Sequence, residues 1–290
     1  MYNRAHPKNT GILSLFSHID PRNMVAEIKK LFFGLEVHSP WPEQLPQGRI
    51  IEKTDRHLTL AFLGPIVFSK IQEILPLLPL PPFQVGLVGS FDHCLFLPLK
   101  HPHVAAWHVH WLEPAEVLES YQKQLVKWLK SYQFSVNEYD QFLPHVTICR
   151  DPIHQSEWEQ SFVSLPLIIS HLHLYESLPH SKYKPIWSHH FLPPFEEVEH
   201  TADLAFLIYG ENLNQLYCHA YIALAFKFPP LMGLFIPIEI EEGVNDIIMH
   251  LNEAISKADI NIGCPFKAVS FHGEIEEENN ILKWEMIIDV

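Results

Sequence analysis

Two short segments with the same pattern constrain the fold of this chain most strongly. They are HLTL at 57–60 and HVTI at 145–148, and each lies in an apolar stretch that predicts a β-strand. Side chains alternate between the two faces of a strand, so the histidine and the threonine of each motif share one face. We therefore expect a fold in which two strands, distant in the sequence, bring two imidazoles and two hydroxyls into one cleft.

This set of side chains suits the hydrolysis of a phosphoester. Histidine titrates near neutrality, so one neutral imidazole can accept a proton from water while an imidazolium donates one to the leaving oxygen. Threonine hydroxyls can donate to the non-bridging oxygens as charge develops there. A single histidine on a strand is more often an ordinary polar residue, and the chain has 20 histidines. Two copies in equivalent strands favour a catalytic pair that needs no metal.

The predicted elements give an α+β fold with mainly antiparallel strands. Asp20 and Pro21 are typical of a helix start, and we expect a helix through 25–33. Further helices are predicted at 69–78, 115–132, 212–226 and 244–256. Strands are predicted at 11–20, 56–64, 83–89, 93–99, 104–112, 142–150, 167–177, 184–192, 203–210, 234–241, 266–276 and 281–290.

The distribution of charge predicts a domain boundary near residue 195, with 192–200 as a linker. Residues 1–194 hold 17 acidic and 16 basic residues, whereas 195–290 hold 17 acidic residues against 4 lysines. The C-terminal part is therefore not expected to bind a polyanion through bulk charge. The four cysteines form no CxxC pair, and the chain shows no secretory leader or long apolar run, so we expect a cytoplasmic protein without a membrane partner.

The first part of the chain resembles the 2H phosphoesterases, in particular the LigT-like RNA 2′,3′-cyclic phosphodiesterases. The resemblance covers about residues 10–192 and rests on GRIIEKTDRHLTLAFLG, FLPHVTICR and LHLYESLPHSKYKPI. It implies that 1–194 form a two-lobed, pseudo-symmetric domain of antiparallel sheets flanked by helices. It also implies an activity, the opening of a terminal 2′,3′-cyclic phosphate of RNA to a 2′-phosphate.

The resemblance implies roles for individual residues. His57 and His145 are the expected acid and base, with His57 protonating the leaving O3′ and His145 activating water. Four further residues are expected to bind the substrate: Thr59 and Thr147 its phosphate, Phe62 the terminal base, and Arg150 a phosphate or another part of the RNA.

The second part, 195–290, resembles a shortened archease, a small α+β domain. EVEHTADLAFLIYG matches the start of that family and FKAVSFHGEIEEENNILKWEMIIDV its end. The resemblance implies a divalent cation (calcium, magnesium or manganese) held by Asp203, Asp289 and Val290, and His200, Lys267 and His272 occupy matching positions. It also implies an RtcB-type RNA ligase as a partner and a role in tRNA splicing or repair.

Two alternatives stay open at this stage. One is a non-enzymatic protein that binds RNA ends and activates such a ligase, and the other is a 2′,5′-oligonucleotide phosphodiesterase. The histidine-rich stretch 101–110 is interpreted as an exposed strand face rather than as a zinc site. HLHLYES at 171–177 is interpreted in the same way. The sequence contains no P-loop or GxGxxG motif that would support nucleotide hydrolysis.

Overall fold

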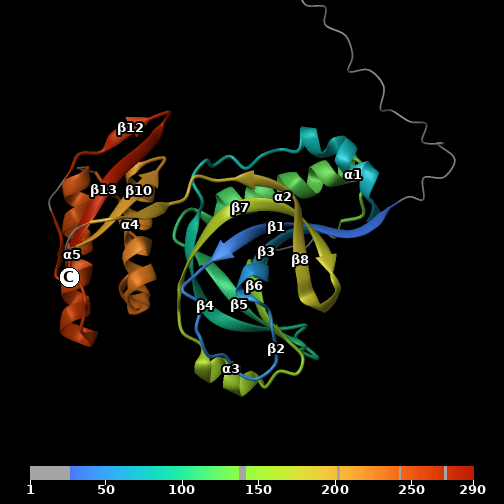
Figure 1. Ribbon diagram of the computed structural model, residues 1–290, viewed down its shortest axis with the longest axis horizontal. Helices are drawn as coiled ribbons and strands as arrows, with labels where there is room; N and C mark the ends of the chain where they lie inside the picture. The colour runs from blue at the N-terminus through green and yellow to red at the C-terminus, as the bar shows by residue number, and fades with distance from the viewer. Residues whose placement is uncertain (1–26, 137–141, 201–202, 242, 271–272) are drawn as a thin grey trace, which may run out of the picture.

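A large antiparallel sheet forms the first part of the molecule (Figure 1). The computed structural model describes residues 27–136, 142–200, 203–241, 243–270 and 273–290. The sheet has eight strands, of which β1 pairs with both β3 and β7, so that β1, β3, β6, β5, β4 and β7 close into a ring. Its strands are β1 (Ile28–His38), β2 (Arg49–Ile50), β3 (His57–Val67), β4 (Val88–Leu97), β5 (Val104–Trp111), β6 (His145–Arg150), β7 (Pro166–Leu178) and β8 (Lys182–His190).

The register of the central strands separates an apolar face from a polar one. Leu35 of β1 lies between Leu58 of β3 and Leu172 of β7, and all three side chains are fully buried. They belong to the same core as the apolar stripe of α2 (Ala115–Ser131), whose spacing of Leu118, Leu125 and Leu129 is that of an amphipathic helix. Two shorter helices, α1 (Phe68–Ile74) and α3 (Gln155–Ser161), complete this part.

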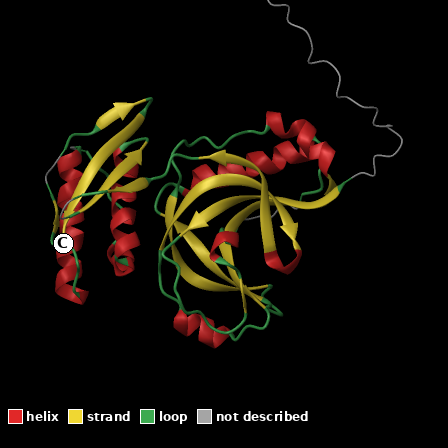
Figure 2. Ribbon diagram, in the orientation of Figure 1, coloured by secondary structure: helices red, strands yellow, loops and turns green. Residues whose placement is uncertain are grey.

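A second, five-stranded sheet begins at Phe195 and is covered by helices on one side (Figure 2). Its strands are β9 (Phe195–Val198), β10 (Leu204–Gly210), β11 (Ala268–Val269), β12 (Glu276–Glu278) and β13 (Ile281–Asp289), and its helices are α4 (Leu213–Lys227) and α5 (Val244–Ile262). The N-terminus of α4 is capped by Asn212, whose side chain accepts from the backbone N–H of Gln215 at 3.0 Å.

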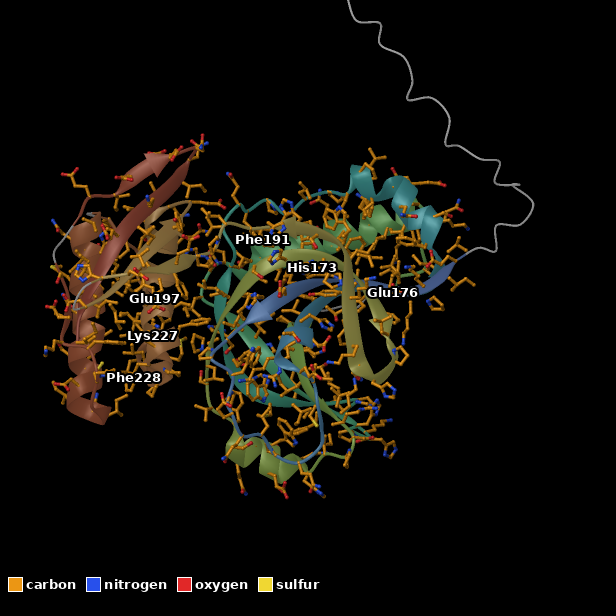
Figure 3. All side chains as sticks on the ribbon, in the orientation of Figure 1. His173, Glu176, Phe191, Glu197, Lys227 and Phe228 are labelled. Atoms are coloured by element: carbon orange, nitrogen blue, oxygen red, sulfur yellow. The ribbon has the colours of Figure 1, made fainter. Side chains whose placement is uncertain are left out.

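Helix α4 is buried along most of its length because it packs on both parts of the molecule. Residues 216–225 are all buried, which is typical of a helix that is apolar on every side. It contacts β10 and β13 of its own sheet and β4 and β7 of the first sheet. At its exposed end, Lys227 Nζ lies 2.7 Å from a carboxylate oxygen of Glu197 on β9, a pair visible in Figure 3.

A buried glutamate connects the two parts. Glu113, which follows β5, accepts the backbone N–H of Val88 at 2.7 Å, and its other oxygen lies 3.6 Å from Nε2 of the fully buried His219 on α4. Buried polar groups are costly when they lose their partners. The buried carboxylate therefore fixes the end of β5 to the start of β4 at the place where α4 packs on the first sheet.

Replacing Glu113 by alanine is expected to destabilise the protein by about 1–3 kcal/mol, because the buried N–H of Val88 loses its acceptor. The midpoint of urea unfolding measures the effect. Glu113→Gln is the matched control, since its amide oxygen can still accept from Val88 and should retain much of the stability. Equal losses for the two variants would contradict this role.

The predicted mixture of helices and antiparallel strands is confirmed, since every ladder between described strands is antiparallel. All four cysteines are unpaired. The helices predicted at 69–78, 115–132, 212–226 and 244–256 are present as α1, α2, α4 and α5 with shifted ends. In the described residues, no helix is both long and apolar enough to cross a membrane.

The helix predicted through 25–33 is wrong, because residues 28–38 form β1. The run 31–35 is buried on both faces, since Phe33 and Leu35 belong to the core on one face and Phe32 packs on Tyr175 on the other, and a continuous apolar run is typical of such a strand. The predicted strand 11–20 and the helix start at Asp20 and Pro21 lie outside the described residues.

Three other boundaries differ from the prediction. In place of the strands expected at 83–89 and 93–99 the structure has one strand, β4, with a bulge between Phe91 and Cys94, and residues 83–87 lie outside it. The expected linker contains β9. The strand predicted at 234–241 is absent, because Pro237 cannot donate to a ladder and the N–H of Ile240 donates to the Asn214 side chain instead. In the described part of 266–276, only the short β11 and the first residue of β12 are strand.

Candidate active site

The two His-x-Thr motifs meet on the face of the first sheet that is opposite to α2. We call it the histidine face and define it by Glu36, His57, Thr59, His145 and His171. Glu36 of β1 pairs with His57 on one side and with His171 on the other, and Gly34 pairs with Thr59.

Strands β3 and β6 join at one pair, Leu58 opposite Val146. In an antiparallel pair the next residues on either side face each other, so His57 lies across from Thr147 and Thr59 across from His145. The motifs are therefore crossed, and each histidine is opposite the threonine of the other motif. The register therefore places the two motifs side by side, as expected from the sequence.

Both histidines are held by the same backbone contact. Nδ1 of His57 lies 2.8 Å from the carbonyl oxygen of Asp55, and Nδ1 of His145 lies 2.8 Å from that of Leu143. A carbonyl oxygen only accepts, so each Nδ1 carries the hydrogen, and Nε2 holds the free lone pair of the neutral ring. Each motif thus presents Nε2 for proton exchange with a ligand.

The loop before His57 is fixed in turn by Asp55. This carboxylate is 7% exposed and accepts the backbone N–H of Tyr183 at 2.9 Å and Nζ of Lys182 at 3.0 Å. The carbonyl that holds the His57 ring is therefore tied to the start of β8, a segment more than 120 residues away in the sequence. Such support keeps the orientation of a catalytic ring constant.

Three aromatic rings surround His57. The ring centroid of His57 lies 4.5 Å from that of Tyr183, 4.7 Å from that of Phe32 and 5.3 Å from that of Tyr175. The pKa of His57 is lowered to about 4, mainly by desolvation in this surrounding, with smaller contributions from the positive charges of Arg150 and His145 and an opposing one from the hydrogen bond to the Asp55 carbonyl.

His145 lies in a more open position, and burial also lowers its pKa, with a smaller contribution from His108. Both imidazoles are therefore neutral at pH 7 in the free protein. A bound anion would favour the protonated form of either ring. The site is thus arranged for a negatively charged ligand, whose binding would be accompanied by uptake of a proton from solvent.

Gly34 allows the aromatic rings to pack beside His57. A Cβ atom at this position would lie 3.3 Å from the Phe32 ring, 3.4 Å from the Tyr175 ring and 3.0 Å from the carbonyl oxygen of Leu58. A glycine inside a strand often marks such a close approach. These aromatic neighbours of His57 were not predicted from the sequence. The alternation Phe32-x-Gly34-x-Glu36 could have indicated a strand with these side chains on one face, but the segment was predicted to be a helix.

The residues expected to bind substrate lie on or near the histidine face. Phe62 pairs with Phe32 and is 47% exposed. Thr59 and Thr147 are half-buried, and within the part of the chain that the structure describes their hydroxyls have no hydrogen-bond partner. Arg150 is half-buried at the end of β6. The two threonine hydroxyls, which lie across from the histidines, are therefore available to a ligand bound between them.

The residues expected to hold a cation in the second part meet at one end of the second sheet. The register that pairs Leu204 with Ile288 sets Asp203 across from Asp289. Lys267 Nζ donates to the carbonyl oxygen of Val290, and Ser270 Oγ lies 3.3 Å from Oδ1 of Asp289. The groups of three or more close metal-ligand side chains found among described residues include neither aspartate. His200 Nδ1 lies 3.8 Å from Asp203, and His272 lies outside the described residues.

The interpretation of 171–177 as an exposed strand face is wrong. His173 is 5% exposed and His171 is half-buried, because His173 packs against Tyr175 and the two histidine rings stack on each other, with centroids 4.9 Å apart in both contacts. Both rings contact Glu36, whose pKa the hydrogen bond from His173 lowers to about 2, helped by the nearby His38 and His171 and opposed by burial. In the stretch 101–110, His101, His103 and His110 are exposed as expected.

Comparisons with known proteins give a weak likeness to phosphoesterase structures. No protein family and no curated protein matches the chain significantly. The chain is similar to the solved structure of E. coli LigT complexed with 3′-AMP, with 21% identity and a TM-score of 0.42 over 57% of this chain and 99% of that one. It is also similar to TT0787 of Thermus thermophilus, with 17% identity and a TM-score of 0.41 over 56% and 97% of the two chains. A structure described as a phosphoesterase gives 20% identity and a TM-score of 0.41 over 57% and 99%.

Proposed function

We propose that residues 1–194 form a metal-independent phosphodiesterase that opens the terminal 2′,3′-cyclic phosphate of RNA to a 2′-phosphate. The crossed pair of histidines carries the proposal. Each ring is held at Nδ1 by a backbone carbonyl and presents Nε2 on the same face, and each lies across from a threonine hydroxyl. Two positioned proton-transfer groups with hydroxyl donors between them are what an in-line attack on phosphorus requires.

The surroundings of the two rings favour different roles. The more open His145 is accessible to water, so its Nε2 accepts a proton as the water oxygen bonds to phosphorus. The P–O3′ bond breaks, and His57 donates its Nε2 proton to O3′ within the aromatic surround that excludes competing water. The bound phosphate supplies the negative charge that allows His57 to carry this proton. The hydroxyls of Thr59 and Thr147 donate to the non-bridging oxygens.

One assay tests the reaction and its alternatives. The full chain is incubated with EDTA and an oligonucleotide that ends in a 2′,3′-cyclic phosphate, and the product is identified. We expect a 2′-phosphate that His57→Asn and His145→Asn abolish. A 3′-phosphate product would contradict the role of O3′ as leaving group. Binding of the end without turnover would favour an accessory protein, and preferred cleavage of 2′,5′-linkages would favour the oligonucleotide phosphodiesterase.

Phe62 is proposed to stack on the terminal base. Its ring is exposed on the face that carries the histidines, and stacking of a base on an aromatic residue contributes about 1–3 kcal/mol. Phe62→Ala is therefore expected to raise KM about 5- to 150-fold with little change in kcat. Leu99→Ala, at an apolar residue that is 86% exposed elsewhere on the surface, is the control. An unchanged KM in Phe62→Ala would show that the base binds elsewhere.

For residues 195–290 we propose an archease-like accessory role for an RtcB-type RNA ligase. Support comes from Asp203 and Asp289, whose opposed carboxylates beside the C-terminal Val290 suit a hard divalent cation. Turnover of such a ligase with added protein tests the proposal. Asp203→Ala and Asp289→Ala are expected to remove the stimulation, while Asp259→Ala, at an exposed position on α5, should keep it. Absence of stimulation by the unmodified protein would contradict the proposal.

A further inference from the structure

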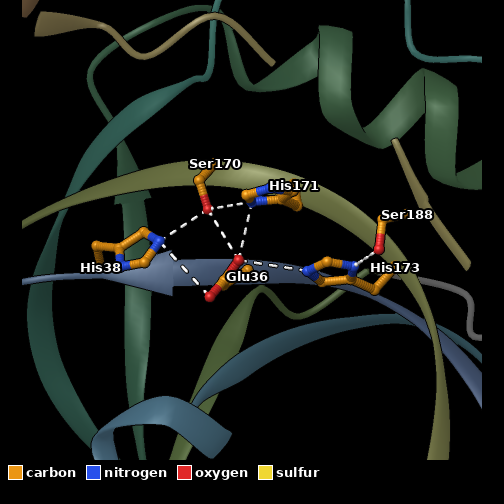
Figure 4. Close-up of polar contacts among 6 residues, drawn as sticks. All are labelled: Glu36, His38, Ser170, His171, His173 and Ser188. Atoms are coloured by element: carbon orange, nitrogen blue, oxygen red, sulfur yellow. Dashed lines mark hydrogen bonds and ion pairs between the residues drawn. The ribbon is translucent and has the colours of Figure 1, made fainter. Parts of the chain in front are cut away.

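A second cluster of ionisable side chains lies on the histidine face beside His57. Glu36 is at its centre, and His171 and His173 reach it from β7 (Figure 4). Oε2 of Glu36 lies 2.8 Å from Nδ1 of His171 and 3.3 Å from Nε2 of His173. All three atoms are within 4.8 Å of one another. The mechanism proposed above gives this cluster no role.

The spacing of these atoms matches the requirements of a small divalent cation. Zinc binds nitrogen and carboxylate oxygen at about 2.0–2.2 Å in a tetrahedron, so its ligand atoms are about 3.3–3.5 Å apart. The separations of the carboxylate oxygen from the two ring nitrogens are close to this range. Two imidazoles and one glutamate are also the ligand set of zinc sites that keep a position open.

A neighbouring serine orients His173 as it would orient a metal ligand. The second nitrogen of His173, Nδ1, lies 2.8 Å from Oγ of Ser188, so Nδ1–H can donate to the hydroxyl while Nε2 is free to bind a metal. Ser170 Oγ lies 3.1 Å from the Glu36 carboxylate and 2.8 Å from Nδ1 of His171, the nitrogen that would bind the ion, so a bound ion would replace this hydrogen bond. In the metal-free protein, imidazole protons occupy the space that a cation would take, and binding would release them.

The cluster is enclosed and still accessible. The side chains of His173, His171 and Glu36 are 7%, 24% and 28% exposed, so the cluster is largely shielded and still reached by solvent. The more exposed His38 lies beside it, with Nε2 3.8 Å from Oε1 of Glu36. A comparable group, formed by Asp92, His93 and His108, is more open, with side chains 39%, 52% and 22% exposed.

We propose that Glu36, His171 and His173 form a binding site for one divalent transition-metal ion of the zinc class, with a fourth position left for His38, water or an anionic oxygen. Softer nitrogen ligands beside a single carboxylate favour zinc, cobalt or nickel over magnesium or calcium. The proposal does not depend on the phosphodiesterase activity, because the histidine pair acts without an ion.

Titration of the full chain with cobalt and zinc tests this site. After removal of metals with EDTA and dialysis, we expect one equivalent of Co²⁺ to bind with the visible absorption of a four- or five-coordinate ion, and zinc to displace it. Affinity should fall at least about tenfold from pH 7.5 to pH 5.5, because the ligand imidazoles must lose their protons. Ser188→Ala should weaken binding about 10- to 100-fold through the orientation of His173.

Variants distinguish this site from the other histidines of the chain. Glu36→Gln and His171→Gln are expected to remove the stoichiometric binding and its spectrum, whereas His93→Gln should leave both unchanged. Absence of stoichiometric metal binding by the unmodified protein overturns the proposal, and this result does not depend on whether the variants fold. Binding that persists in Glu36→Gln, or that His93→Gln removes, also overturns it by placing the ion elsewhere.

Discussion

Replacing either His57 or His145 by asparagine is expected to lower kcat for 2′,3′-cyclic phosphate hydrolysis by about 10²- to 10⁴-fold. Each ring moves one proton in the proposed transition state, and neither can act for the other because both Nδ1 atoms are bound to the backbone. The double variant should be little slower than the worse single one, because residues that act as a unit are not additive. Single-turnover assays with purified variants measure these losses.

A change of leaving group separates the two roles. A phosphodiester with a p-nitrophenolate leaving group needs no protonation, so it should be cleaved by the variant that lacks the acid. We expect His57→Asn to retain much of its activity on that substrate and His145→Asn to lose it. The opposite result would exchange the two assignments. His101→Asn, at an exposed histidine outside the site, serves as the control. Equal activity of all variants on the cyclic phosphate would contradict the whole mechanism.

The catalytic pair could be predicted because its signal is local. A His-x-Thr motif in an apolar strand determines which face each side chain takes, and two copies indicate that the faces meet. The crossing of the motifs follows only from the pairing of Leu58 with Val146, a contact between strands that no local pattern specifies. The hydrogen bond from each Nδ1 to the carbonyl oxygen two residues earlier depends on loop geometry, which no local pattern specifies either.

The failures of prediction also have a common physical origin. Residues 28–38 contain apolar side chains on both faces because Phe33 and Leu35 face the core and Phe32 packs on Tyr175 on the other side of the sheet, and such a run can equally be a helix. Once β1 was taken for a helix, Glu36 had no predicted neighbours. His171 and His173 were then expected on an exposed strand, although both contact Glu36 of that same strand, β1. One misassigned central strand thus concealed the whole cluster around Glu36.

The pH dependence of kcat/KM is expected to show an optimum on the acidic side of pH 6.5. This parameter reports the pKa values of the free enzyme, and the active form has His57 protonated and His145 neutral. Because His57 has the lower pKa, this is the less populated of the two singly protonated forms, and its fraction is still greatest between the two pKa values. The lower pKa is that of His57, about 4, and the upper is that of His145, which burial holds below its usual 6.5. Above the upper value both rings are neutral, so kcat/KM should fall about tenfold per pH unit, or about 100-fold from pH 6.5 to 8.5.

Substitution of an aromatic ring beside His57 tests whether desolvation is the cause of its low pKa. Tyr183→Ala opens the ring of His57 to water, and because desolvation is the largest influence on its pKa, the acidic limb of the profile should move upward from pH 4. Tyr132→Ala removes an exposed ring that follows α2 and should leave the profile unchanged. A plateau of kcat/KM between pH 7 and 9 in the unmodified protein would mean that no histidine proton is needed. In that case, His57 would have to act by hydrogen bonding to the phosphate rather than as the acid.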